Sequence, residues 1–71
     1  MIDPKQYLVE VRPLSAQEGG GWFATLPDLD GCHGDGDTPS EAIEDGYRAA
    51  EAWLRVAEEV GDPIPQPSGE D

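Results

Sequence analysis

The chain of 71 residues has one cysteine, one histidine, few basic residues and no long apolar run. A single cysteine excludes an internal disulfide, which favours a reducing compartment. No stretch approaches the roughly 20 apolar residues that cross a membrane, and the acidic start with its proline lacks the features of a signal peptide. We therefore expect a soluble, cytoplasmic protein without a membrane partner.

The shortage of basic residues stands beside an excess of acids. Four Lys and Arg face sixteen Asp and Glu, for a net charge of −12. Such a charge repels nucleic-acid phosphates, so direct binding to DNA or RNA is not expected. A domain of this size buries only about 60% of its unfolded surface, which favours help from a partner subunit.

Short periodic segments separated by turn residues predict three β-strands. Residues 6–12 alternate in polarity up to Pro13, which is expected to end the strand. The glycines at 19–21 form a turn, and the aromatic and branched residues of 21–26 predict a second, antiparallel strand. Residues 32–36, whose glycines allow a bend, predict a weaker third strand. The expected sheet is an antiparallel meander.

A long helix is predicted over residues 39–60. Thr38 suits the N-cap, Pro39 suits the first helical position, and Glu41 completes a capping box. Apolar or small side chains recur at spacings of three and four, so one face should pack on the sheet. That face comprises Ile43, Gly46, Tyr47, Ala50, Trp53, Leu54, Ala57 and Val60.

The helix is expected to stop at Gly61, followed by an extended, proline-rich tail over residues 62–71. Together these elements predict one α+β domain over residues 1–71, with three antiparallel strands and one helix packed on one face of the sheet.

The stretch LPDLDGCHGDGDTPSEA, residues 26–42, contains four aspartates together with the only cysteine and histidine. A divalent cation needs several converging oxygens. Asp28 and Asp30, however, precede the strand that carries Asp35 and Asp37, and the calcium-loop pattern is not met. We interpret these aspartates as a solvated acidic rim near a helix N-terminus, where the helix dipole favours acids.

Other candidate chemistry in this stretch is also unsupported. Neighbouring residues of a strand face opposite sides, so Cys32 and His33 cannot act together as nucleophile and base. Cys32 is expected to be buried and His33 exposed. Trp22, Tyr47 and Trp53 fit core packing better than a stacking platform for bases. No catalytic, cofactor-binding or metal-binding residue is predicted.

Three motifs in this order resemble the HicB family of antitoxins. They are Pro27–Cys32, the helix entry Gly36–Thr38 with Glu41 and Ala42, and the exit Gly61–Pro65. The resemblance implies a partial RNase H-like fold without the nuclease's catalytic acids. It also implies a partner, a small basic HicA-like toxin that cleaves mRNA. The acidic charge agrees independently, because opposite charge speeds the capture of a basic protein.

The resemblance also suggests two interaction surfaces. The acidic rim is the expected toxin contact and comprises Asp28, Asp30, Asp35, Asp37 and Glu41. Many family members have a further strand beside the first and a C-terminal DNA-binding domain, and this chain ends before either. The first strand should then keep an open edge, and open edges recruit partners. The residues of that edge, expected to serve a homodimer, a higher oligomer or toxin docking, are Tyr7, Leu8, Val9, Glu10, Val11 and Arg12.

Two alternatives to a toxin-binding antitoxin stay open. One is a metal-dependent, RNase H-like ribonuclease that uses Asp30, Asp35 and Asp37. The other is a solitary HicB-like protein with a different binding role. A neighbouring reading frame for a short basic protein would separate the antitoxin from the solitary protein.

Overall fold

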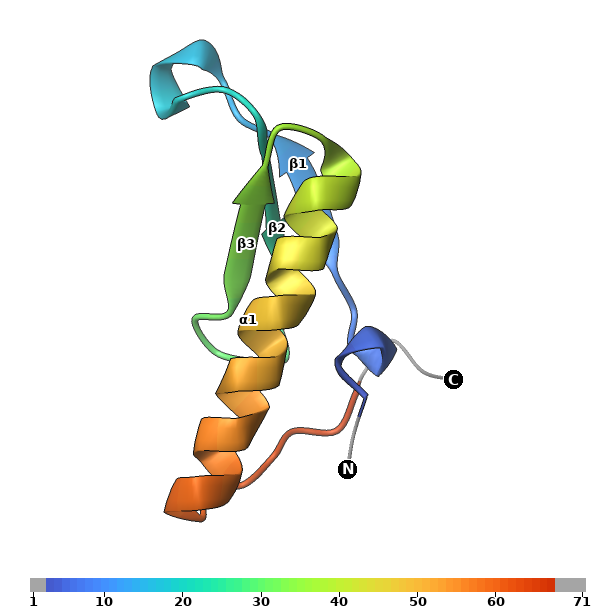
Figure 1. Ribbon diagram of the computed structural model, residues 1–71, viewed down its shortest axis with the longest axis vertical. Coiled ribbons are helices and arrows are strands. Elements are labelled where there is room, and N and C mark those ends of the chain that lie inside the picture. Colours follow the sequence, from blue (N-terminus) through green and yellow to red (C-terminus); the bar gives the residue numbers. More distant parts are fainter. Residues whose placement is uncertain (1–2, 68–71) are drawn as a thin grey trace.

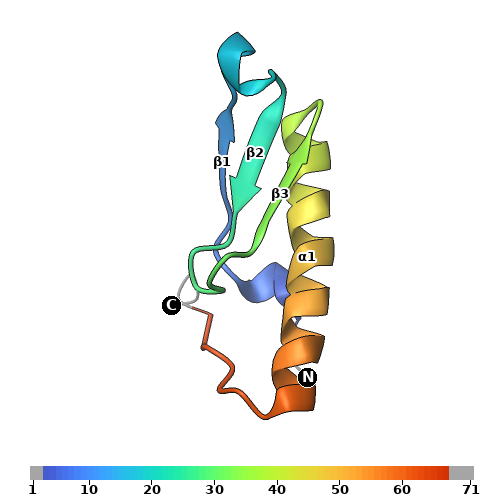
Figure 2. The ribbon, with the colours of Figure 1, turned by 90° about the vertical axis from the view of Figure 1, so that its left-hand side faces the viewer.

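The computed structural model describes residues 3–67 and shows a three-stranded antiparallel sheet with one long helix along one face (Figure 1). The strands are β1 (Glu10–Pro13), β2 (Trp22–Thr25) and β3 (His33–Gly36), and the helix is α1 (Pro39–Val60). The sheet order is β1-β2-β3, a meander. Seen from the side, α1 covers one face of the sheet and leaves the other open (Figure 2). The predicted α+β architecture is confirmed.

The first strand begins later than predicted. Residues 6–12 were expected to form it, but residues 4–6 form a short 3-10 helix and β1 covers only residues 10–13. Asp3 caps that 3-10 helix, because its side chain accepts a hydrogen bond from the N–H of Lys5 at 3.0 Å. The second and third strands lie within their predicted ranges of 21–26 and 32–36.

Pro13, predicted to end the first strand, is the last residue of β1. The N–H of Leu14 donates to the carbonyl oxygen of Gly21 at 2.8 Å, which extends the ladder beyond Pro13. Hydrogen-bonded and non-bonded pairs alternate along antiparallel strands, so the backbone of Pro13 points away from β2. An outward position on an edge strand has no ladder bond to lose, and proline is tolerated there.

Tyr7 belongs to the core and not to an exposed strand edge, which corrects the prediction for this residue. Its side chain is 3% exposed and packs with Leu26, Leu29 and Leu54. The Tyr7 hydroxyl donates to the carbonyl oxygen of Pro65 at 2.6 Å. This bond holds the tail, which runs without helix or strand over residues 62–67, against the N-terminal segment. The rest of the predicted tail, residues 68–71, lies outside the described residues.

The ends of α1 follow the predicted signals, with one difference. The Thr38 hydroxyl accepts the N–H of Glu41 at 3.1 Å, and Gly61 ends the helix in the left-handed conformation at φ 77°. The Glu41 carboxylate, however, accepts the N–H of Asp37 at 3.0 Å instead of the N–H of Thr38. The predicted capping box is therefore formed only in part.

The buried face of α1 is narrower than predicted. Its buried members are Ala42, Gly46, Ala50, Leu54 and Ala57. Ile43, Tyr47 and Trp53 are half-buried, and Val60 is 63% exposed. Val60 was predicted to pack on the sheet, but α1 extends past the end of the strands (Figure 1).

The sheet and helix approach each other through two glycines. A Cβ on Gly34 of β3 would overlap the backbone nitrogen of Gly46 on α1. A Cβ on Gly46 would instead lie 3.2 Å from the Leu26 side chain, whose end can move. The glycines of β3 thus allow close packing against α1.

We predict that Gly34→Ala lowers the free energy of unfolding by about 3 kcal/mol, because backbone on both sides must separate. Gly46→Ala should stay within about 1 kcal/mol of the wild type, since the better helix propensity of alanine offsets the shift of Leu26. Urea denaturation followed by circular dichroism measures both variants. Equal losses in the two would contradict this account of the contact.

We predict that Tyr7→Phe destabilises the fold by about 1 kcal/mol through loss of the hydrogen bond to Pro65. Burial raises the pKa of Tyr7 above its ordinary value of 10.0, and the nearby Asp28 carboxylate adds to the shift. The raised pKa means that Tyr7 stabilises the fold at lower pH and that this stability is lost as the pH rises above about 10. Denaturation from pH 8 to 11 should therefore show a steeper decline for the wild type than for Tyr7→Phe. Tyr47→Phe is the matched control, and an equal effect there would contradict a specific role for Tyr7.

Candidate functional site

The five acidic residues of the predicted rim are spread along β3, before it and after it. Asp28 and Asp30 are in the turn between β2 and β3, whereas Asp37 and Glu41 are at the start of α1 (Figure 2). Asp35 lies on β3 itself, on the open face of the sheet. Within residues 3–67 there is no group of three or more His, Cys, Asp or Glu side chains placed to hold a metal ion. The structure does not bring the five acids together in one cluster.

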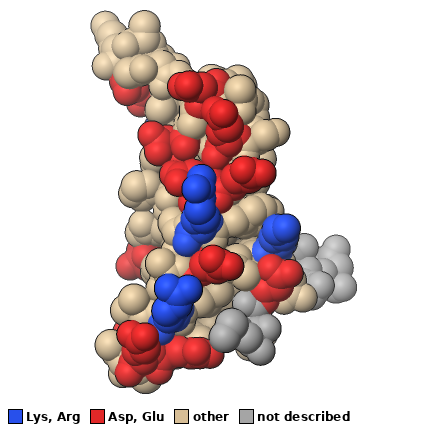
Figure 3. Space-filling model, viewed as in Figure 1, with Lys and Arg blue, Asp and Glu red and all other residues tan. Residues whose placement is uncertain are grey.

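Carboxylates at the junction of β3 and α1 hold the backbone in place. Asp45 accepts the N–H of Asp35 at 3.1 Å, and its other oxygen lies 3.7 Å from the guanidinium of Arg48. The remaining charge here is largely negative. Figure 3 shows acidic side chains crowded over the upper part of the molecule, where α1 begins, and a second group at its lower end. Both groups are suited to attract a cationic partner.

Cys32 and His33 have the predicted placement. Cys32 is buried, and its thiol lies 3.9 Å from the carbonyl oxygen of Gly46. Burial raises the pKa of this thiol, which favours the protonated form over the reactive thiolate. His33 is exposed on the other side of the strand. The pair therefore does not form a nucleophilic centre.

The open face of the sheet carries an aromatic cluster that the sequence did not reveal. The rings of Phe23 and His33 stack with centroids 5.3 Å apart, and the Arg12 guanidinium lies 5.5 Å from the Phe23 centroid. Arg12 is directly opposite Phe23 in the sheet, and His33 is opposite Thr25. Only the strand register brings these side chains together.

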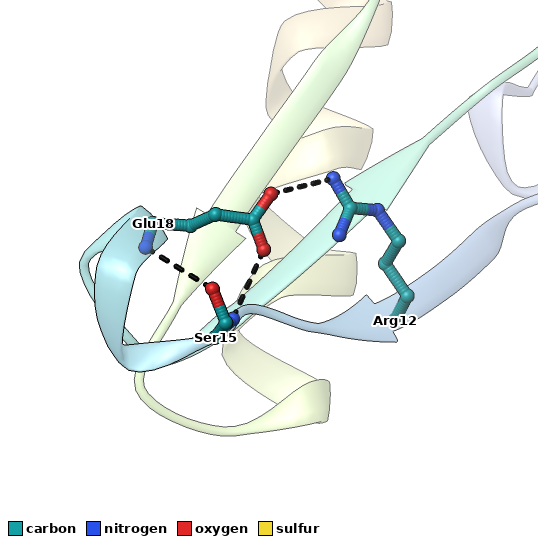
Figure 4. Close-up of polar contacts among 3 residues, drawn as sticks. All are labelled: Arg12, Ser15 and Glu18. Atoms are coloured by element: carbon teal, nitrogen blue, oxygen red, sulfur yellow. Dashed lines mark hydrogen bonds and ion pairs between the residues drawn. The ribbon is translucent and has the colours of Figure 1, made fainter.

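The charge of Arg12 is balanced within the chain. Its guanidinium lies 3.5 Å from the carboxylate of Glu18, which also accepts the N–H of Ser15 at 3.0 Å (Figure 4). The Ser15 hydroxyl in turn accepts the N–H of Glu18 at 3.2 Å, which completes a capping box. The Ser15 N–H, assisted by Arg12, lowers the pKa of Glu18. The open face thus presents no unbalanced arginine to nucleic-acid phosphates.

The predicted oligomer edge is shorter than the sequence suggests. Of its six residues, only Glu10, Val11 and Arg12 lie in β1, an outer strand whose residues are all exposed. Leu8 is exposed before the strand, and Val9 is half-buried against the core. Because proline has no N–H, Pro13 reduces the donors that this edge offers.

A groove of about 500 Å³ lies between α1 and the turn that precedes β3. It is lined by Gly31, Cys32, His33, Ala49, Ala52, Trp53, Val56, Ala57 and Asp62. The Trp53 indole N–H donates to the carbonyl oxygen of Asp30 at 2.9 Å, which fixes the ring beside the turn. Trp53, which was predicted to pack in the core, is half-buried; it packs against the core cluster and also forms a wall of this groove. The sequence held one sign of this groove. Val56 is an apolar residue of the helix that does not belong to the predicted core stripe.

No helix in the described part of the chain is long and apolar enough to cross a membrane. Residues 7–71 match a family model described as the HicB-like antitoxin of bacterial toxin–antitoxin systems. The UPF0150 protein ssr1765 of Synechocystis sp. is 34% identical over 65 residues, which cover 92% of this chain and 82% of that protein. No solved structure matches the chain significantly. As its turn and helix-boundary motifs predict, the chain belongs to the HicB-like antitoxin family of bacterial toxin–antitoxin systems.

Proposed function

We propose that this chain is an antitoxin that binds and neutralises a small, basic, HicA-like toxin that cleaves mRNA. Membership of the antitoxin family supports this role. The observation that carries the proposal is the net charge of −12 together with the acidic groups near both ends of α1 (Figure 3). We place the protein in the cytoplasm, where mRNA is the toxin's target, and assign it no direct contact with nucleic acid.

The proposed mechanism is electrostatic capture followed by steric masking. A basic RNA-binding protein is drawn to the acidic groups at long range, and its association slows as salt screens the charges. Once bound, carboxylates occupy the cationic groups that would otherwise hold RNA phosphates. The antitoxin thereby competes with mRNA without chemistry of its own.

A non-enzymatic role also agrees with the placement of the acids. The ribonuclease alternative needs Asp30 to act together with Asp35 and Asp37. Asp30 precedes β3, whereas Asp37 follows it, and each strand residue adds about 3.3 Å. Two catalytic metal ions lie only about 4 Å apart, so their ligands must converge more closely than the ends of β3 do.

We also propose that the β1 edge supports self-association as a homodimer or higher oligomer. β1 is an outer strand, and Leu8 and Val11 present exposed apolar side chains beside its open backbone. A second copy would cover these groups and enlarge the small core. The toxin is the alternative occupant of this edge.

The toxin contact is tested by removing charge from each end of β3 separately. Asp35→Asn with Asp37→Asn, and Asp28→Asn with Asp30→Asn, each remove two charges at nearly constant shape. The binding partner in this test is the basic protein encoded by an adjacent reading frame. We predict that the double variant whose aspartates lie at the contact associates with it about tenfold more slowly at low salt. The association rate of that variant should also depend less on salt. Stopped-flow kinetics measures the rate, and growth rescue on co-expression measures neutralisation.

The matched control is Glu51→Gln with Glu58→Gln, which removes the same charge from another flank of α1. Circular dichroism establishes that each variant is folded. A wild-type chain that fails to rescue growth would contradict the antitoxin proposal. Unchanged association in both aspartate pairs would place the contact elsewhere, with the β1 edge as the alternative.

The ribonuclease alternative is tested by metal addition. We predict that millimolar Mg²⁺ or Mn²⁺ leaves Tm unchanged relative to NaCl of equal ionic strength, because a ligand that binds only the native state must raise Tm. Differential scanning fluorimetry measures the shift. A rise specific to either metal, with RNA cleavage by the purified chain, would support the nuclease and contradict the antitoxin.

A further inference from the structure

We infer that the groove between α1 and the β2–β3 turn binds a positively charged amphipathic helix of a partner protein. The inference rests on the proposed function in one respect, since it identifies that partner with the basic toxin. The binding surface comprises the groove and the exposed end of α1 beyond it, where the fold leaves apolar side chains uncovered.

The helix side of the groove is apolar and open. Ala49, Ala52 and Val56 line it, and Val56 is 55% exposed. Val60 continues the same line one turn further and is 63% exposed. Positions spaced by three and four share one side of a helix, and small side chains among them let a second helix approach closely. This line lies beside the buried face of α1 and is separate from it.

Trp53 gives the groove a rigid wall. The hydrogen bond from its indole N–H to the Asp30 carbonyl oxygen holds the ring in place before any partner binds. The ring is only half-buried, so a partner can still cover part of it. Large aromatic side chains that are already ordered commonly dominate binding energy, because little entropy is lost when the partner docks.

The charges around the groove select a cationic occupant. Asp62 lines the groove, and Asp45 and Glu59 are exposed or half-exposed within one turn of Ala49 and Val56 on α1. The guanidinium of Arg48 lies 3.7 Å from Asp45 and balances part of this charge. A second copy of this chain would bring like charges together across the contact, whereas a basic helix pairs with them.

A helix laid in an apolar groove is recognised through side chains at positions i, i+3 or i+4, and i+7. A groove of about 500 Å³ accommodates a few such side chains. The expected occupant therefore places two or three leucine-like side chains against Val56 and Trp53, with lysine or arginine facing the acidic border.

Trp53 itself can report on the groove. The chain has two tryptophans, so Trp22→Phe leaves Trp53 as the single indole. The probe is a synthetic lysine-rich helix with leucine at i, i+3 and i+7, and its control has glutamine in place of leucine at equal charge. We expect the leucine peptide to shift Trp53 emission to shorter wavelength in a saturable manner and the glutamine peptide to leave it unchanged. Equal responses to the two peptides would overturn the inference, because charge alone would then account for binding.

A second variant places the site on the groove. In the same background, Val56→Gln should weaken peptide binding at least tenfold. Ala16→Gln, which changes an exposed alanine in the short 3-10 helix over residues 16–18, is the matched control and should bind as the parent does. Loss in both variants, or in neither, would overturn the assignment to the groove. Sedimentation that shows a dimer dissociated by Val56→Gln would assign the groove to a second copy and likewise overturn it.

Growth rescue separates this inference from the proposed function. Rescue by the wild type and by Ala16→Gln, but not by Val56→Gln, supports both the antitoxin role and the groove as the toxin contact. Equal rescue by all three leaves the antitoxin role intact and overturns the groove as the toxin contact. In a third outcome, the wild type fails to rescue growth and yet binds the leucine peptide selectively through Val56. That result excludes the toxin as the partner and retains a basic helix as the class of ligand.

Discussion

The close approach of β3 to α1 is the constraint on which the rest of the structure depends. Gly34 leaves no space for a side chain against the backbone of Gly46, so the strand lies directly on the helix. Alanines then suffice to fill the contact at Ala42 and Ala50, and the larger core side chains gather toward the tail, around Leu54 and Tyr7. A small chain without a disulfide thereby reaches close packing with few large residues.

The same contact organises the surfaces proposed for binding. Because β3 runs straight into α1, Asp37 and Glu41 meet at the helix N-terminus, where each contributes to one hydrogen bond. At the opposite end of β3, the turn lies beside Trp53 and encloses the groove. Acidic charge and exposed apolar surface thus occur on neighbouring parts of α1, a combination that fits the basic amphipathic partner proposed above.

Much of the fold was predictable, and the errors have physical causes. The N-cap of Thr38 and the stop at Gly61 are local signals, so both ends of the helix were placed correctly. The first strand was started too early because alternating polarity does not reveal that residues 4–6 form a 3-10 helix and that Tyr7 packs in the core. Val60 was assigned to the core because periodicity does not reveal where the sheet beneath the helix ends. The candidate site was less predictable, since the groove and the two separate acidic groups depend on how β3 lies against α1.

The sequence by itself determined the order of strands and helix, the negative charge and the family, because these follow from local periodicity, composition and short motifs. Only the tertiary structure decided that Tyr7 is buried and bonded to Pro65, that Arg12 faces Phe23, and that Trp53 forms a wall of a groove. Each of these contacts joins residues far apart in the chain. Their partners are set by strand register and by the distance between sheet and helix, which no local pattern encodes.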